Sequence, residues 1–125
     1  MRKRAEFERI QGKGERVDTR HFVFVLAAQL APGQPRLGIT ASRRIGNAVV
    51  RNRAKRLVRE AFRATGELWP RGIDVVVIVR KPLGELKLPA VLDEWRGAAR
   101  GLAKRLEKLS RVAPPPAEGK TGPGA

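Results

Sequence analysis

The sequence contains no cysteine, no tyrosine and a single histidine, His21, in 125 residues. The missing cysteines exclude disulfide scaffolds, thiol nucleophiles and thiolate metal sites, and they fit a reducing compartment. The 12 acidic residues are scattered apart from one adjacent pair, and one imidazole cannot supply an acid–base pair. A lone histidine on a strand is more often structural than a base or ligand. We therefore expect no catalytic residue and no directly bound metal or cofactor in this chain.

Long hydrophobic runs are also missing. The longest uninterrupted apolar run, residues 22–28, is far too short to cross a bilayer. No apolar stretch of signal-peptide length follows the basic start. These features favour a soluble, cytoplasmic protein. A peripheral membrane protein with a basic amphipathic helix is a weaker alternative, because so small a domain needs the apolar face of that helix for its core.

Positive charge, in contrast, is abundant. The chain carries 27 Lys and Arg against 12 Asp and Glu, a formal net charge of +15. Its length fits one domain, and a domain this small and charged repels itself unless a polyanion offsets the charge. Nucleic acid is the expected partner.

Hydrophobic periodicity predicts a single α+β domain, an α/β sandwich of three helices and a mixed sheet of about four strands in the order αβββαβα. The tail, residues 112–125, is rich in proline and glycine and is expected to be disordered, which leaves residues 1–111 as the nucleic-acid-binding domain. Asn47 is a good N-cap for the middle helix. The expected helices are 3–12, 48–64 and 88–109, and the expected strands are one or two within 15–26, then 36–42 and 73–79.

The middle helix and the residues before it carry the densest signal. Residues 43–63 hold eight cations and one carboxylate, Glu60. A charge run is usually a solvated helix face, but such faces alternate cations with Glu at i,i+4, and that pairing is almost absent here. Arginine predominates, and its planar guanidinium grips phosphate bidentately. This pattern favours contact with RNA or DNA.

A second candidate surface lies on the strands. Residues 36, 38, 40 and 42 alternate as a small, polar face that leaves room for an extended chain, and sheet platforms of this kind suit single-stranded nucleic acid. On the preceding strand, alternation places Phe22 and Phe24 toward the core and Val23 and Val25 on the opposite face.

The order of these motifs resembles the bacterial ribonuclease P protein component. The resemblance covers about residues 3 to 109 and is strongest in the middle helix. The matching segments are Phe7, Lys13-x-Glu15, Arg20-x-Phe22, Gly38-Ile39-Thr40-x-Ser42-Arg43-Arg44, Gly46-Asn47-Ala48-Val49, Arg51-Asn52-Arg53-x-Lys55-Arg56-x-x-Arg59 and Val79-Arg80-Lys81-Pro82.

This resemblance implies a subunit of an endoribonuclease, a hydrolase that removes the 5′ leader from precursor tRNA. The partners would be the catalytic RNA subunit, whose Mg²⁺ ions perform the cleavage, and precursor tRNA, with no DNA and no membrane. The protein alone would be inactive. The resemblance also implies a left-handed β-α-β crossover around the arginine-rich helix. The residues expected to bind the catalytic RNA are Arg43, Arg44, Asn47, Arg51, Asn52, Arg53, Lys55, Arg56, Arg59 and Arg63.

The family's leader-binding cleft lies between the first helix and the open face of the sheet. This chain departs from the family at Gln11 and Val25, where aromatic residues are common, so base stacking there would be weaker. Arg80 and Lys81 fit the family pattern but equally suit a solubilised strand end. Phe7 suits the core as well as the cleft. The residues expected to line the cleft are Phe7, Lys13, Val23, Val25, Arg36, Thr40 and Ser42.

Two other classes of nucleic-acid-binding protein remain. A ribosomal-type structural RNA-binding protein has the same composition, and the RNA that copurifies with the chain would separate the two readings. A DNA-binding regulator is weaker, because no helix-turn-helix pair or dimer seam surrounds the basic helix.

Overall fold

A computed structural model of the chain describes residues 14–29 and 33–112. The predicted first helix and the predicted tail beyond residue 112 lie outside the described residues. The four strands are β1 (Glu15–Asp18), β2 (Phe22–Ala28), β3 (Arg36–Thr40) and β4 (Ile73–Val79). The helices are α2 (Ala48–Ala64), α3 (Leu88–Gly97) and α4 (Ala99–Val112), with short 3-10 turns η1 (Arg43–Ile45) and η2 (Gly66–Leu68).

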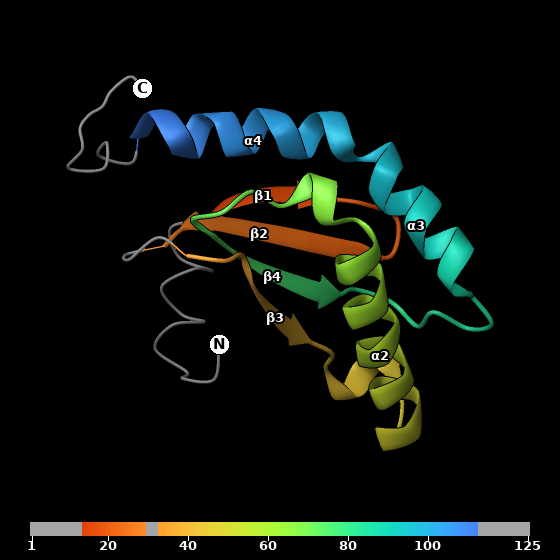
Figure 1. Ribbon diagram of the computed structural model, residues 1–125. Coiled ribbons are helices and arrows are strands. Elements are labelled where there is room, and N and C mark those ends of the chain that lie inside the picture. The colour runs from red at the N-terminus through yellow and green to blue at the C-terminus, as the bar shows by residue number, and fades with distance from the viewer. Residues whose placement is uncertain (1–13, 30–32, 113–125) are drawn as a thin grey trace.

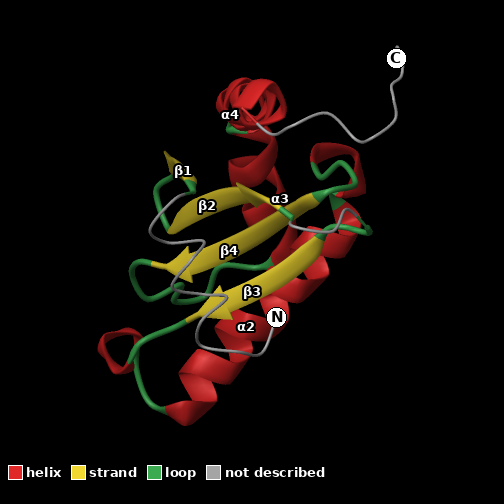
Figure 2. Cartoon of the chain, turned by 90° about the vertical axis from the view of Figure 1, so that its left-hand side faces the viewer, coloured by secondary structure: helices red, strands yellow, loops and turns green. Residues whose placement is uncertain are grey.

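The strands form one mixed sheet in the order β1-β2-β4-β3. β2 pairs antiparallel with β1 and β4, whereas β3 and β4 are parallel and are joined through α2. In Figure 2 the strands β3 and β4 point to the left, α2 passes behind them, and β4 lies above β3. That path makes the crossover left-handed, against the usual right-handed rule and as the family resemblance implied. The mixed four-stranded sheet predicted from the sequence is confirmed.

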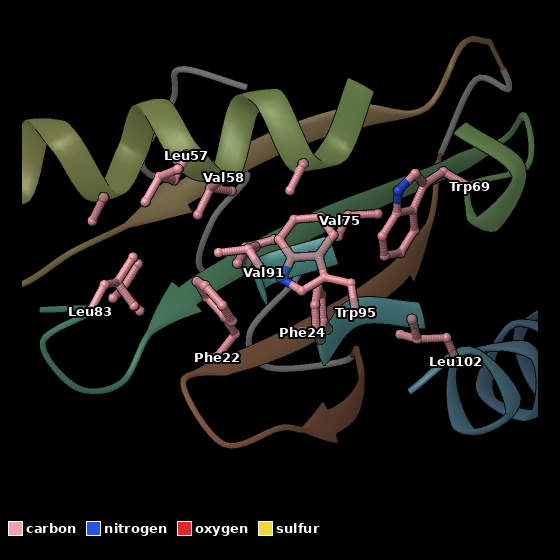
Figure 3. Packing of buried hydrophobic residues seen from close by; sticks show 14 of the residues in the cluster. Phe22, Phe24, Leu57, Val58, Trp69, Val75, Leu83, Val91, Trp95 and Leu102 are labelled. Carbon is pink, nitrogen blue, oxygen red and sulfur yellow. The ribbon is translucent and has the colours of Figure 1, made fainter. Parts of the chain in front are cut away.

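The helices cover one face of the sheet and enclose the main core (Figure 1). Phe22 and Phe24 are fully buried there, as the alternation predicted. Trp95 of α3 packs edge-on against both phenyl rings, at centroid distances of 5.7 and 5.0 Å (Figure 3). Trp69 is also buried and stacks on Phe62 at 5.3 Å. Five aromatic side chains therefore pack together between the helices and β2.

The last predicted helix is two helices. The hydrophobic stripe runs on as expected, but the backbone bends at Ala98, whose N–H bonds to the Trp95 carbonyl three residues back at 3.0 Å. Figure 1 shows the resulting change of direction between α3 and α4. The bend lets Trp95 and Leu102, both nearly inaccessible, reach the same core from different helices.

Candidate nucleic-acid interface

The start of α2 is fixed by two adjacent residues. The Asn47 side chain accepts a hydrogen bond from the Val50 backbone N–H at 3.0 Å, as an N-cap does. Gly46 has φ +148°, and a Cβ there would lie 2.9 Å from the Val50 Cβ. Only glycine fits this approach without strain. The sequence Gly46-Asn47 therefore sets the point from which the basic residues of α2 project.

The outer face of α2 is a cationic surface. Ala54, Leu57, Val58 and Ala61 turn into the core, which leaves the polar side of the helix facing away from the sheet. Within residues 14–29 and 33–112, no α2 cation forms an ion pair with a carboxylate. Predicted RNA-binding residues classed as exposed are Arg43, Arg44, Asn47, Asn52, Arg56, Arg59 and Arg63, whereas Arg51, Arg53 and Lys55 are half-buried.

Two features of this surface were not predicted from the sequence pattern. Val49, an apolar side chain, is 76% exposed at the first turn of α2. Arg53 turns toward the segment after β4, where its terminal nitrogens donate to the Gly84 and Leu86 carbonyls at 3.2 and 2.6 Å. Two of the ten residues expected to bind the catalytic RNA, Asn47 and Arg53, therefore have intramolecular side-chain partners.

The face of the sheet opposite the helices brings together most of the predicted cleft residues. The register places Val25, Val76 and Gly38 in one row across the strands, and Val23, Ile78 and Thr40 in the next. Val23 and Val25 are each only 5% exposed, so they form an apolar floor and offer little surface of their own. Phe7 and Lys13 lie outside the described residues.

Arg36 borders this floor and is held by a buried acid. The Arg36 Nε and a terminal nitrogen donate to the two carboxylate oxygens of Asp74 at 2.8 and 2.9 Å. Asp74 is fully buried and also accepts from Gln29 Nε2 at 3.2 Å. Burying a carboxylate is costly unless it is paired, and the bidentate guanidinium supplies that pairing. Two of the five N–H donors of the Arg36 side chain are thus directed at Asp74.

The two candidate surfaces meet at an open pocket of about 470 Å³. Its walls come from the end of β4 and the residues that follow it, from η1 and from single residues of β1 and β2, so Ser42 and Arg44 lie in the same pocket as Val23. Arg16, Arg80 and Lys81 complete its cationic lining. These three were not among the predicted site residues, although Arg80-Lys81 belongs to a segment that resembles the family. The sequence pattern could not identify them as one site, because only the strand order brings residues 16, 44 and 80 together.

Arg16 and Arg80 are oriented by one carboxylate beside the pocket. The Arg16 Nε donates to Asp18 at 2.8 Å, and this hydrogen bond lowers the pKa of the Asp18 carboxyl and raises the pKa of Arg16. An Arg80 terminal nitrogen donates to the Thr19 carbonyl at 2.9 Å and lies 3.9 Å from Asp18. Four cations line the pocket and one acid adjoins it, so its net charge is positive and suits a phosphate chain.

In the part of the chain that the structure describes, no three His, Asp or Glu side chains gather as metal ligands. His21 instead packs against α3, where its Nδ1 donates to Glu94 at 2.7 Å. Among the residues that the structure describes, every helix is also too short or too polar to span a bilayer.

Known proteins similar to this chain share its fold and most of its length. The family model described as Ribonuclease P matches residues 1–103. The ribonuclease P protein component of Desulfovibrio desulfuricans is 39% identical over 115 residues, which cover 91% of this chain and 85% of that protein. The component of Bacillus pumilus is 41% identical over 86 residues, covering 69% of this chain and 72% of that protein.

Two solved structures resemble the described fold. The RNase P protein of Staphylococcus aureus superimposes with a TM-score of 0.71 at 32% identity, covering 84% of this chain and 94% of that one. The RNase P protein of Thermotoga maritima gives 0.68 at 30% identity, covering 91% and 97%.

Proposed function

This chain belongs to the ribonuclease P protein family, and from that membership we propose how it divides its surface between two RNAs. The outer face of α2 binds the catalytic RNA subunit. The border of the sheet face opposite the helices and the cationic pocket receive the single-stranded 5′ leader of precursor tRNA. Cleavage is performed by the RNA subunit with its own Mg²⁺ ions in the cytoplasm. Membership of this family favours the ribonuclease P role over the alternative of a ribosomal-type structural RNA-binding protein.

The observation that carries the first assignment is the unpaired charge of α2. Arg56, Arg59 and Arg63 are exposed on one helix side. Like charges at i,i+4 destabilise a helix by a few tenths of a kcal/mol per pair, so the arrangement is unfavourable for the free protein. Phosphates facing these side chains reverse that effect and release counterions. The duplex regions of a folded RNA present such phosphates in closely spaced rows.

The second assignment rests on the shape and charge of the pocket. An extended strand that runs along the polar border of the apolar floor reaches the pocket at the end of β4, where Arg80 and Lys81 face its phosphates. Polar side chains such as Thr40 border the path. Because no described aromatic ring lies on this face, binding relies on charge and backbone contacts more than on base stacking.

The division is tested by measuring two quantities for the same variants: affinity for the catalytic RNA as a function of salt, and the preference of the holoenzyme for precursor over mature tRNA. For Arg59→Ala, the slope of log affinity against log salt should flatten by about 0.7 to 0.9, one charge's worth. For Lys81→Ala, that slope should stay unchanged and the preference for precursor should fall. Lys104→Ala, which removes an exposed cation from α4, is the matched control and should change neither quantity. If Arg59→Ala and Lys81→Ala both reduced only catalytic-RNA affinity, the proposed division would be wrong.

A further inference from the structure

Arg53 is the second arginine of the Arg51-Asn52-Arg53 string, yet its surroundings differ from those of its neighbours in α2. Its shorter hydrogen bond, 2.6 Å to the Leu86 carbonyl, crosses from α2 to a segment 33 residues further on. The second bond reaches the Gly84 carbonyl at 3.2 Å. Two of the three guanidinium nitrogens thus point away from the outer face of α2 and toward this segment.

The segment itself is built to present those carbonyls. Gly84 has φ +60°, a conformation that favours glycine, and the Leu86 N–H bonds back to the Leu83 carbonyl at 3.0 Å. Leu83 is 5% exposed and is anchored in the main core. The turn is therefore fixed on one side by a buried leucine and on the other by the planar fork of Arg53.

The same segment begins at the cationic pocket. Lys81 and Pro82 line the pocket, and Leu83 and Gly84 follow them directly in the chain. Only two or three peptide units separate Gly84 from Pro82 and Lys81 of the pocket wall. Arg53 consequently links the helix assigned to the catalytic RNA with the wall assigned to the leader.

We propose that Arg53 is a positioning residue: it holds the 82–86 turn against α2 and so sets the pocket wall for the leader, and it does not bind phosphates of the catalytic RNA. The proposal rests on the proposed function, because it assigns one residue of the basic helix to the leader side. It reassigns a residue that the sequence motif groups with the RNA contacts.

The test compares Arg53→Ala and Arg53→Lys with Arg59→Ala in the holoenzyme. We expect Arg53→Ala to leave the salt slope of catalytic-RNA binding unchanged, whereas Arg59→Ala flattens it by about 0.7 to 0.9. Arg53→Ala should also lower the preference for precursor over mature tRNA by about 2- to 12-fold. This range corresponds to one ordinary hydrogen bond and is smaller than the loss of both Arg53 bonds, because Leu83 still anchors the turn in the core. Arg53→Lys keeps the charge but loses the fork, so it should restore the preference only in part.

The outcomes separate this inference from the function on which it rests. A flattened slope in Arg53→Ala that Arg53→Lys fully restores would show a phosphate contact and overturn the inference alone. An unchanged slope in Arg59→Ala would instead contradict the role of α2. If Arg53→Ala failed to fold, Arg53→Lys would still decide, because full precursor preference in that variant contradicts a role that needs the fork.

Discussion

Glu94 ties the β1–β2 turn to α3, and removing its carboxylate should destabilise the protein strongly. The carboxylate accepts three hydrogen bonds: from Thr19 Oγ at 2.6 Å, and from the His21 backbone N–H and Nδ1 at 2.7 Å each. The side chain is only 14% exposed. The Thr19 carbonyl in this turn also accepts a hydrogen bond from Arg80, which lines the pocket. By holding the turn, Glu94 therefore supports one wall of the pocket.

The size of the effect follows from the number of donors left without an acceptor. A hydrogen bond to a charged group contributes about 1.5 to 3 kcal/mol, and water reaches part of this site. Glu94→Ala should therefore lower the free energy of unfolding by about 3 kcal/mol, or the melting temperature by roughly 10 to 20 °C for a domain of this size. Glu94→Gln keeps one acceptor oxygen and should lose about half as much.

The loss should also depend on pH. Burial alone would raise the pKa of the Glu94 carboxyl, but the hydrogen bonds from Thr19 and His21 outweigh it, and the net pKa is lowered. A group whose pKa is lower in the folded state stabilises it above the unfolded pKa, and this contribution disappears as the pH falls through the folded pKa. The gap between wild type and Glu94→Gln should thus be full near neutral pH and shrink below about pH 4.

Urea unfolding of wild type, Glu94→Gln and Glu94→Ala across this pH range measures both effects. Thr19→Ala, which removes one of the three donors, is a useful companion and should cost less than Glu94→Ala. The reasoning is refuted if Glu94→Ala changes the free energy of unfolding by less than about 0.5 kcal/mol, the range of an ordinary surface substitution. A gap that stays constant into strong acid would refute the electrostatic part.

Three further substitutions test the local structure, each by urea unfolding with circular dichroism. Gly46→Ala should lower the free energy of unfolding by about 1 to 3 kcal/mol, because the φ of +148° and the 2.9 Å approach to Val50 leave no room for a Cβ. Adding Val50→Ala to the same chain should recover part of that loss. Asn47→Ala should cost about 1 kcal/mol through loss of the N-cap; no change would argue against the cap. Thr65→Val should cost about 1 to 3 kcal/mol, because the buried Trp69 indole N–H, 3.0 Å from Thr65 Oγ, loses its acceptor; an unchanged midpoint would mean that water replaces the hydroxyl.

The fold was predictable in the segments whose residue pattern is compatible with only one type of secondary structure. The expected helix 48–64 and strand 73–79 coincide with α2 and β4, since a strong cap, a clear period and flanking glycines define them. Alternation in β2 identified Phe22 and Phe24 as core. The bend at Ala98 was not predictable, because the hydrophobic stripe continues through it while only the backbone turns.

The site was predictable as a set of residue types but not as an arrangement. The charge pattern of α2 indicated an outer cationic face, and that face exists. It could not show that Arg53 reaches the carbonyls of residues 84 and 86, because those partners depend on tertiary structure. The pocket shared by Arg16, Arg44 and Lys81 depends in the same way on the strand order. The left-handed crossover came from the resemblance and not from the residues.

The most direct test of the central claim is cleavage of a 5′-extended precursor tRNA by a bacterial ribonuclease P RNA at low Mg²⁺, with and without this protein. We predict strong stimulation at the mature 5′ end and no cleavage by the protein alone. Tight binding to the RNA without stimulation would contradict the role as a ribonuclease P subunit, and cleavage by RNA-free protein would contradict catalysis by the RNA.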